Sequence, residues 1–227
     1  MRRQVGKAIP FGVVASLELT AAGFAPPWMG VMFAWAGLAT GWVALAYLLE
    51  RPRLLAKTSG GRWLLGPYTA TAGLVARLAQ RLGVSERDEV APGLWVGGWP
   101  RRHSDTWAQL DCTSELPRRG RSSAYLCVPM LDGLEVRPRE LVDAAAQART
   151  WRGSGHPVLV HCAYGHGRSV AVACVVLVCD GDEPSLEQAL HRVQRHRPRA
   201  RMSQGQRAAA LEAIESLRAA GRAQPTS

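Results

Sequence analysis

The most continuous apolar pattern of the chain lies near its N-terminus. Residues 28–49 (WMGVMFAWAGLATGWVALAYLL) contain no charged side chain over 22 positions. That is enough helix to cross roughly 30 Å of hydrocarbon at about 1.5 Å per residue. Small residues recur within it at spacings of three and four, which would let a second helix approach one face closely, although such residues are common in membrane helices in general: Ala34, Gly37, Gly41 and Ala44.

A second apolar segment, residues 8–24, precedes the first across an Ala-Pro-Pro turn. No small-residue cleavage site separates the two, so the pattern favours a two-helix hairpin over residues 1–52 rather than a signal peptide. Glu18 lies near the middle of this segment, where it is either a functional carboxylate or a protonated, helix-paired one. Basic residues flank the hairpin at both ends and predict that both ends face the cytoplasm: Arg2, Arg3 and Lys7 before it, and Arg51, Arg53, Lys57 and Arg62 after it.

Residues 53–88 follow the hairpin as a linker. Positions 63–82 (WLLGPYTATAGLVARLAQRL) mix apolar and basic side chains. This pattern fits an amphipathic helix on the membrane surface and fits a plain connecting helix equally well.

The rest of the chain alternates short apolar strands with helices. We expect strands at residues 94–98, 124–130 and 158–161, and helices at 138–151, 169–179, 184–197 and 203–220. The helix at 169–179 (SVAVACVVLVC) is apolar all round, which is typical of a core helix. The order predicts an α/β domain over residues 89–221, with a central, largely parallel sheet flanked by helices, followed by a disordered tail at 222–227.

Charge and cysteine content narrow the function. The net charge of +10 favours an anionic partner: a phosphate ester, an anionic lipid or a nucleic acid. No motif of alternating aromatic and basic residues supports nucleic-acid binding, so we expect none. The five cysteines are odd in number, contain no CxxC pair and are absent from the first 111 residues, which favours reduced thiols over a disulfide framework.

One stretch carries most of the chemistry, residues 158–170 (VLVHCAYGHGRSV). A buried strand ends there, a short turn follows, and an apolar helix begins near Arg168. Such a turn can direct backbone N–H groups inward as an anion cradle, and Gly165 and Gly167 permit the required backbone angles. Cys162 lies at the base of the cradle, where the positive field favours the thiolate. Arg168 offers a planar fork for two phosphate oxygens.

This stretch resembles the signature loop of the cysteine-dependent phosphatases, His-Cys-x5-Arg-Ser. The matching residues are His161, Cys162, Ala163, Tyr164, Gly165, His166, Gly167, Arg168 and Ser169. The resemblance implies that Cys162 attacks phosphorus and that Arg168 and the backbone of residues 163–168 hold the phosphate oxygens. It also implies that Ser169 donates to the sulfur and that His161 orients the loop. A metal site is not expected, because no fourth ligand accompanies His161, Cys162 and His166 at a suitable spacing, and no cofactor is implied.

The order of elements is similar to that of the dual-specificity branch. A candidate general acid, Asp132, follows a strand and lies 30 residues before Cys162; its alternative reading is a turn aspartate before Gly133. Asp111 and Asp143 are poorer candidates, since one opens a strand-like run and the other lies within a helix. Further stretches that resemble this branch are residues 93–98, 111–117, 197–198, 204 and 206.

These observations predict a membrane-anchored phosphatase that works through a phosphocysteine intermediate. The expected substrates are phosphotyrosine, phosphoserine and phosphothreonine in proteins. A lipid phosphatase of the same fold, acting on a phosphoinositide or on phosphatidylglycerophosphate, is the alternative. Basic clusters at residues 118–121 and 192–201 either face anionic headgroups or form a solvated basic surface. A catalytically weak phosphate-binding module is the alternative of another class. We expect an integral membrane protein whose catalytic domain faces the cytoplasm.

Overall fold

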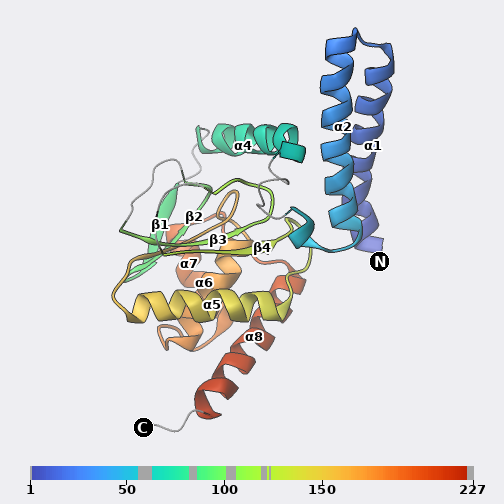
Figure 1. The fold of residues 1–227 in the computed structure, drawn as a ribbon. Helices are drawn as coiled ribbons and strands as arrows, with labels where there is room; N and C mark the ends of the chain where they lie inside the picture. The colour runs from blue at the N-terminus through green and yellow to red at the C-terminus, as the bar shows by residue number, and fades with distance from the viewer. Residues whose placement is uncertain are drawn as a thin grey trace. The chain divides into compact units, whose positions relative to one another are not determined.

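The computed structural model describes residues 2–55, 63–81, 86–100, 106–118, 122 and 124–223. Two basic residues after the hairpin, Lys57 and Arg62, lie outside this description, as do Arg119 and Arg121 of the basic cluster at residues 118–121. The chain divides into two compact units (Figure 1). The first unit comprises Met1–Arg77, Ser114–Arg118 and Leu131–Leu134; the second comprises Leu78–Thr113, Arg119–Met130 and Glu135–Ser227.

The first unit is built around two long helices. Helix α1 (Arg2–Phe24) and helix α2 (Pro27–Leu48) run side by side as a hairpin (Figure 1). The helices approach closely at Gly37, because a Cβ there would lie 2.7 Å from Cγ of Leu19. Within the described residues, the stretches Gly6–Phe24 and Pro27–Leu48 are long and apolar enough to cross a membrane, by length and composition. The expected hairpin of two apolar helices is therefore confirmed as a fold.

Two shorter helices follow. A single 3-10 turn, η1 (Pro52–Leu55), closes against the end of α2, where the indole N–H of Trp42 donates to the carbonyl of Leu54 at 2.9 Å. Helix α4 (Gly66–Arg81) confirms a helix in the linker. It leaves a band of large apolar side chains exposed, in keeping with an amphipathic pattern: Leu74, Val75 and Leu78.

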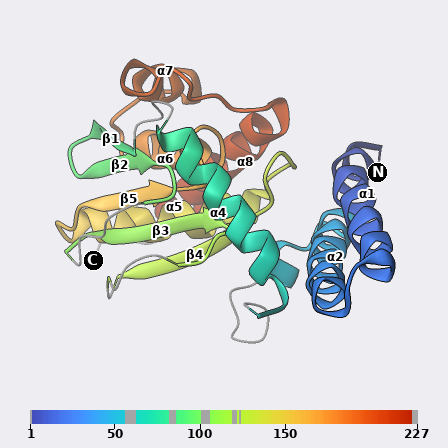
Figure 2. The same cartoon turned by 90° about the horizontal axis from the view of Figure 1, so that it is seen from above.

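The second unit contains a five-stranded sheet in the order β1-β2-β5-β3-β4 (Figure 2). Its strands are β1 (Arg87–Ala91), β2 (Leu94–Gly97), β3 (Ala108–Thr113), β4 (Tyr125–Met130) and β5 (Val158–His161). Only β1 pairs antiparallel with its neighbour, so the largely parallel sheet is confirmed. The sequence pattern did not predict strand β1, because its sequence, RDEVA, begins with three charged residues.

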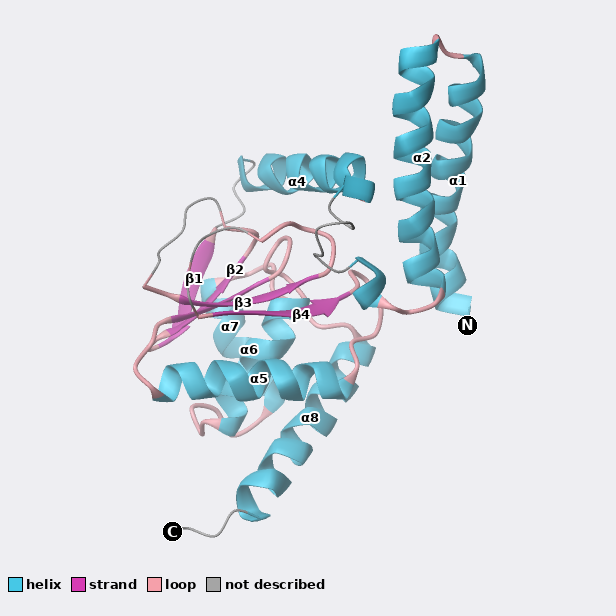
Figure 3. Ribbon diagram, in the orientation of Figure 1, coloured by secondary structure: helices cyan, strands magenta, loops and turns pink. Residues whose placement is uncertain are grey.

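Four helices lie on the same side of this sheet (Figure 3): α5 (Pro138–Gly153), α6 (Arg168–Cys179), α7 (Leu186–His196) and α8 (Gln204–Ala223). Helix α6 is buried from Arg168 to Val178 and forms the centre of the core, as its all-round apolar sequence predicted. Helix α8 continues to Ala223, inside the stretch expected to be a disordered tail. Residues 224–227 are not described.

The register of the sheet positions the site. His161, at the end of β5, pairs with Gly97 of β2 on one side and with Asp111 of β3 on the other. The carboxyl ends of three parallel strands therefore meet at one edge. The loop that connects β5 to α6 leaves the sheet at this edge, which is where open parallel sheets bind their ligands.

Candidate active site: the loop between β5 and α6

Residues 162–167 connect the buried end of β5 to the first residue of α6. The N-cap of α6 is Gly167, which has no side chain to accept hydrogen bonds from the first turn. The N-terminal N–H groups of a helix carry a partial positive charge and need acceptors. Because no side chain caps this helix, its first N–H groups are available to an anion bound at the loop.

The carbonyl groups of residues 163–167 are all engaged by partners outside the loop. Those partners are the N–H of Trp99 for Ala163 (3.1 Å), the guanidinium of Arg197 for Tyr164 and Gly165 (3.2 and 3.1 Å), the N–H of Arg201 for His166 (2.8 Å), and the N–H of Ala171 for Gly167 (2.9 Å). In a trans peptide, a carbonyl and the following N–H point in opposite directions. Each N–H group of residues 164–168 therefore points away from the partner of the preceding carbonyl, as an anion cradle requires.

Gly165 is required by both conformation and space. Its φ is +73°, and a Cβ there would lie 2.6 Å from the backbone carbon of Gly97. Gly167 differs, because a Cβ on it would lie 3.4 Å from the flexible amide end of Gln206 and 3.9 Å from the carbonyl oxygen of Arg201, which are ordinary contacts. The sequence alone suggests the same role for both glycines. The structure shows that the steric requirement applies to Gly165.

Cys162 is buried at the base of this loop, with 3% of its surface exposed. Its sulfur accepts hydrogen bonds from the N–H of Gly165 at 3.2 Å and from the hydroxyl of Ser169 at 3.4 Å. Two donors directed at one sulfur favour its negatively charged form. The arrangement suits a nucleophile at the floor of an anion site.

Arg168 is buried at the start of α6. Its guanidinium donates to the carbonyl of Met130 at 2.8 Å and to that of Cys112 at 3.4 Å. These contacts tie the beginning of the helix to the carboxyl ends of β3 and β4. The side chain is thus held at the same edge of the sheet as the loop.

His161 and Asp111 lie beneath the loop, both almost completely buried. The Nδ1 atom of His161 is 4.0 Å from Oδ1 of Asp111. Asp111 accepts hydrogen bonds from the N–H and hydroxyl of Thr113, at 2.8 and 2.7 Å, and from the hydroxyl of Tyr125 at 2.8 Å. Burial and the neighbouring Asp111 raise the pKa of Tyr125, so its hydroxyl stays protonated as a donor. Asp111 therefore acts in the network that supports the strand ends.

Cys112 lies beside the loop cysteine. Because Asp111 pairs with His161, the two following residues lie near each other: Cys112 within β3 and Cys162 just after β5. Burial, and secondarily Cys162, raise the pKa of the Cys112 thiol well above its usual value. Cys112 is therefore a neutral neighbour of Cys162.

Two aromatic side chains from the loop are only half-buried. Tyr164 and His166 lie with their ring centroids 6.4 Å apart and nearly parallel. Burial lowers the pKa of His166, and the guanidinium groups of Arg197, Arg199 and Arg201 lower it further. His166 is consequently neutral near pH 7.

Arg197 is the residue whose role the sequence missed. It was grouped with the basic cluster at 192–201, but only 4% of its surface is exposed. Besides its bonds to Tyr164 and Gly165, it donates to the carbonyl of Val96 at 3.2 Å and pairs with Asp88 at 2.5 Å. One guanidinium therefore fastens the loop to β1 and β2. Its position just before Pro198, at the end of a helix, was a sequence signal that could have distinguished it from the exposed arginines of that cluster.

Arg192 is also committed to internal contacts. It donates to the carbonyl of Val90 at 2.7 Å and to the carboxylate of Glu183 at 3.2 Å. This corrects the picture of a continuous basic face over residues 192–201. The exposed members of that cluster are Arg195, Arg199 and Arg201.

Asp132 follows the end of β4 by two residues, in a turn with Gly133, whose φ is +71°. Its side chain is exposed. By contacts, Leu131–Leu134 belong to the first unit. The structure thus gathers His161, Cys162, Arg168 and Ser169 in the second unit and assigns Asp132 to the first.

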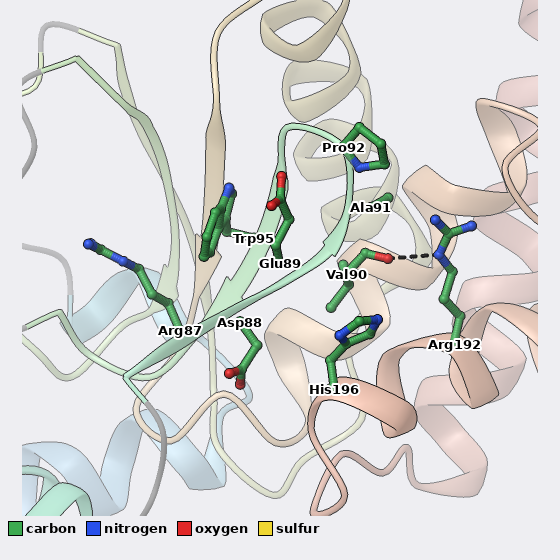
Figure 4. A pocket seen from close by; sticks show the side chains of 9 residues that line it. All are labelled: Arg87, Asp88, Glu89, Val90, Ala91, Pro92, Trp95, Arg192 and His196. Carbon is green, nitrogen blue, oxygen red and sulfur yellow. Dashed lines mark hydrogen bonds between the residues drawn. The ribbon is translucent and has the colours of Figure 1, made fainter.

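A separate open pocket of about 670 Å³ lies along β1 (Figure 4). Its lining combines acidic and basic side chains that offset each other, including Arg87, Asp88, Glu89 and Arg192. It contains no residue of the loop between β5 and α6. In the described part of the chain, no group of three or more His, Cys, Asp or Glu side chains could hold a metal ion.

The chain is similar to protein-tyrosine phosphatases in sequence and in fold. A profile of the protein-tyrosine phosphatase family matches residues 131–215. The fold is similar to that of a mouse putative dual specificity phosphatase complexed with zinc tungstate, at 26% identity over 60% of this chain and 91% of that one, with a TM-score of 0.51. No curated protein matches the chain in sequence.

Two further structures share the fold at lower identity. Human DUSP28 has 24% identity over 58% of this chain and 98% of its own, with a TM-score of 0.52. PTPMT1 in complex with PI(5)P has 15% identity over 60% of this chain and 99% of its own, also with a TM-score of 0.52.

Proposed function

We propose that this phosphoric monoester hydrolase of the cysteine-dependent protein-tyrosine phosphatase superfamily, in its dual-specificity branch, is anchored in a membrane by its N-terminal hairpin. Its substrates are phosphotyrosine, phosphoserine and phosphothreonine in proteins. The loop between β5 and α6 is its phosphate-binding loop, and Cys162 is its nucleophile.

One observation carries the assignment of the loop. Its carbonyl oxygens at 163–167 are all bonded to partners outside the loop, which supports a role for the oppositely directed N–H groups in binding an anion. A cradle of this kind stabilises the equatorial oxygens of a phosphoryl group without reorganising during the reaction. Arg168 adds a charged, planar donor.

The chemistry proceeds in two steps. The Cys162 thiolate attacks phosphorus in line, the bond between phosphorus and the leaving oxygen breaks, and Asp132 supplies a proton to that oxygen. A water molecule then attacks the phosphocysteine while Asp132 accepts its proton, and Cys162 departs as a thiolate. The Ser169 hydroxyl, bonded to the sulfur, stabilises that departing charge. Inorganic phosphate is released.

A lipid phosphatase is the second candidate. Two apolar helices would keep the domain beside anionic headgroups, and a structure with the same fold is a complex with PI(5)P. The half-buried loop residues favour the protein substrate instead. Tyr164 and neutral His166 offer aromatic surface rather than the additional cations that a multiply phosphorylated headgroup would need.

The test compares the two substrate classes on one preparation. The full chain would be placed in phosphatidylcholine nanodiscs and offered phosphotyrosine and phosphoserine peptides. Parallel nanodiscs would carry phosphorylated lipids. We expect faster phosphate release from peptides, and loss of release from both classes in Cys162→Ser. Turnover retained by Cys162→Ser would refute the nucleophile, and faster release from lipids would establish the second candidate.

A further inference from the structure

The acid loop, defined as Leu131–Leu134, packs into the hairpin unit through its two ends. Leu131 and Leu134 are 6% and 9% exposed and belong to a hydrophobic cluster separate from the main core. Asp132 and Gly133, between them, are exposed. The two leucines therefore hold the turn from both sides and present the aspartate outward.

The partners of these leucines come from the hairpin and the segment after it. We call this set the seat: Ala8, Val43, Ala46, Tyr47, Leu55 and Leu65. All six are buried, with Val43 and Leu55 at 0% and 2% exposure. A cluster this well enclosed excludes water and fixes its members in place.

Further contacts stiffen the seat. The ring of Phe11 on α1 lies 5.1 Å from that of Tyr47 on α2, so the two helices are joined at this level. The N–H of Arg51 donates to the carbonyl of Ala46 at 3.0 Å, and Trp42 bonds the carbonyl of Leu54. These bonds set the path from α2 into η1, which carries Leu55.

Helix α1 also reaches the turn itself. A Cβ on Gly133 would lie 2.9 Å from Nζ of Lys7, so the Lys7 side chain rests against the backbone next to Asp132. The left-handed φ of Gly133 allows the chain to turn sharply under this side chain. Both helices of the hairpin thus contribute to the position of the turn.

We propose that the seat is the positioning element for the general acid, so that the hairpin controls proton transfer to the leaving group as well as anchoring the chain. Leu55 and Tyr47 are positioning residues that act through Leu131 and Leu134 on Asp132. This inference rests on the proposed function, in which Asp132 is the acid. It makes the folded hairpin a requirement for full activity on substrates whose leaving oxygen must be protonated.

The test uses two substrates that differ in their need for an acid. The para-nitrophenolate of para-nitrophenyl phosphate departs without protonation, whereas the phenolate of phenyl phosphate needs a proton. The readout is the ratio of kcat for the first substrate to kcat for the second, measured on the full chain in nanodiscs. Asp132→Asn should raise this ratio by about 10²-fold, the lower end of general-acid contributions.

Leu55→Ala and Leu134→Ala should raise the ratio by about tenfold to a hundredfold, because a misplacement of about 1 Å can cost about 10²-fold in rate. Leu55→Met should restore it. Leu38→Ala is the matched control, since Leu38 lies on α2 with 58% of its surface exposed and is not part of the seat; its ratio should equal that of the wild type. A second measurement checks that the nucleophile is intact: the rate at which iodoacetate alkylates Cys162, followed on the peptide that contains it. This rate should be unchanged in the three leucine variants, Leu55→Ala, Leu134→Ala and Leu38→Ala, and in Leu55→Met.

The outcomes separate the two proposals. If Leu55→Ala lowers kcat equally for both substrates, or leaves the ratio unchanged while Asp132→Asn raises it, the seat has no positioning role and the proposed function stands. If Asp132→Asn itself leaves the ratio unchanged, Asp132 is not the acid and the inference falls with that assignment. If Cys162→Ser retains turnover, the proposed function fails independently of the seat.

Discussion

The phosphate-binding loop and the acid loop are held in different ways. The phosphate-binding loop is fastened within its own unit by hydrogen bonds to all of its carbonyls from residue 163 to 167 and by the buried Arg197. The acid loop has two leucines inserted in a cluster formed by the hairpin and the segment after it. The first arrangement is polar and directional, and the second is apolar and depends on helices that precede the catalytic domain. If the two loops have the roles proposed for them, we expect mutations to perturb phosphate binding and protonation of the leaving group separately.

The largest effect should come from Gly165→Ala. The new Cβ would meet the backbone of Gly97 at 2.6 Å, at a φ of +73° that L-residues rarely adopt. We expect kcat to fall by about 10²-fold or more on both aryl phosphates, as the cradle is displaced. Gly167→Ala is the matched control and should lose far less, because the atom nearest to its Cβ would be the flexible end of Gln206, at 3.4 Å. Equal losses in the two variants would contradict the steric argument.

Removing Arg197, the buried clamp of the phosphate-binding loop, should lower both the free energy of unfolding and the turnover rate. Arg197→Ala breaks the pair with Asp88 and frees two loop carbonyls. A fully buried pair broken in this way costs about 3–5 kcal/mol. We expect about 2–3 kcal/mol here, because the Asp88 side chain is 26% exposed. Chemical denaturation of the full chain would measure this, and the leaving-group ratio should not change. A raised ratio would show that Arg197 also serves the acid loop.

Separating the hairpin helices should affect the acid loop alone. In Gly37→Leu the side chain would collide with Leu19 on α1, which forces the helices apart. We expect the leaving-group ratio to rise by about threefold, corresponding to about 0.7 kcal/mol in the barrier, with alkylation of Cys162 unchanged. Gly12→Leu, at a position where a Cβ meets nothing within 4 Å, should match the wild type. A slower alkylation in Gly37→Leu would contradict the separation of the two loops.

The smallest effect concerns His166. Its folded-state pKa lies below the ordinary value of 6.5, because of burial and three neighbouring arginines. As the pH falls through that value the unfolded chain takes up the proton first, so the native state should lose stability between about pH 7 and the lower folded pKa. His166→Gln should reduce this loss. Thermal unfolding of both proteins at about pH 7.5 and about pH 5.5 would measure this loss as a fall in Tm. An equal fall in Tm in the two proteins would contradict the assigned direction of the His166 pKa shift.

Much of the site was predictable because its determinants are adjacent in the chain. Residues 161–169 form one strand end, one loop and one helix start, and each part has a local signature in the sequence. The hairpin was predictable for the same reason, from uninterrupted apolar runs. Strand β1 was not, because its pairing with β2 outweighs the charged residues that open it.

The sequence by itself determined the core helix α6 and the two apolar helices and is the source of the chemistry proposed for the loop, because hydrophobic periodicity and glycine placement act over a few neighbouring residues. Only the tertiary structure decided that Arg197 is a buried clamp, that Gly165 rather than Gly167 is sterically required, and that Leu131 and Leu134 pack with Tyr47 and Leu55. Those contacts join residues far apart in the chain. They depend on how side chains fill a shared volume, which no local pattern records.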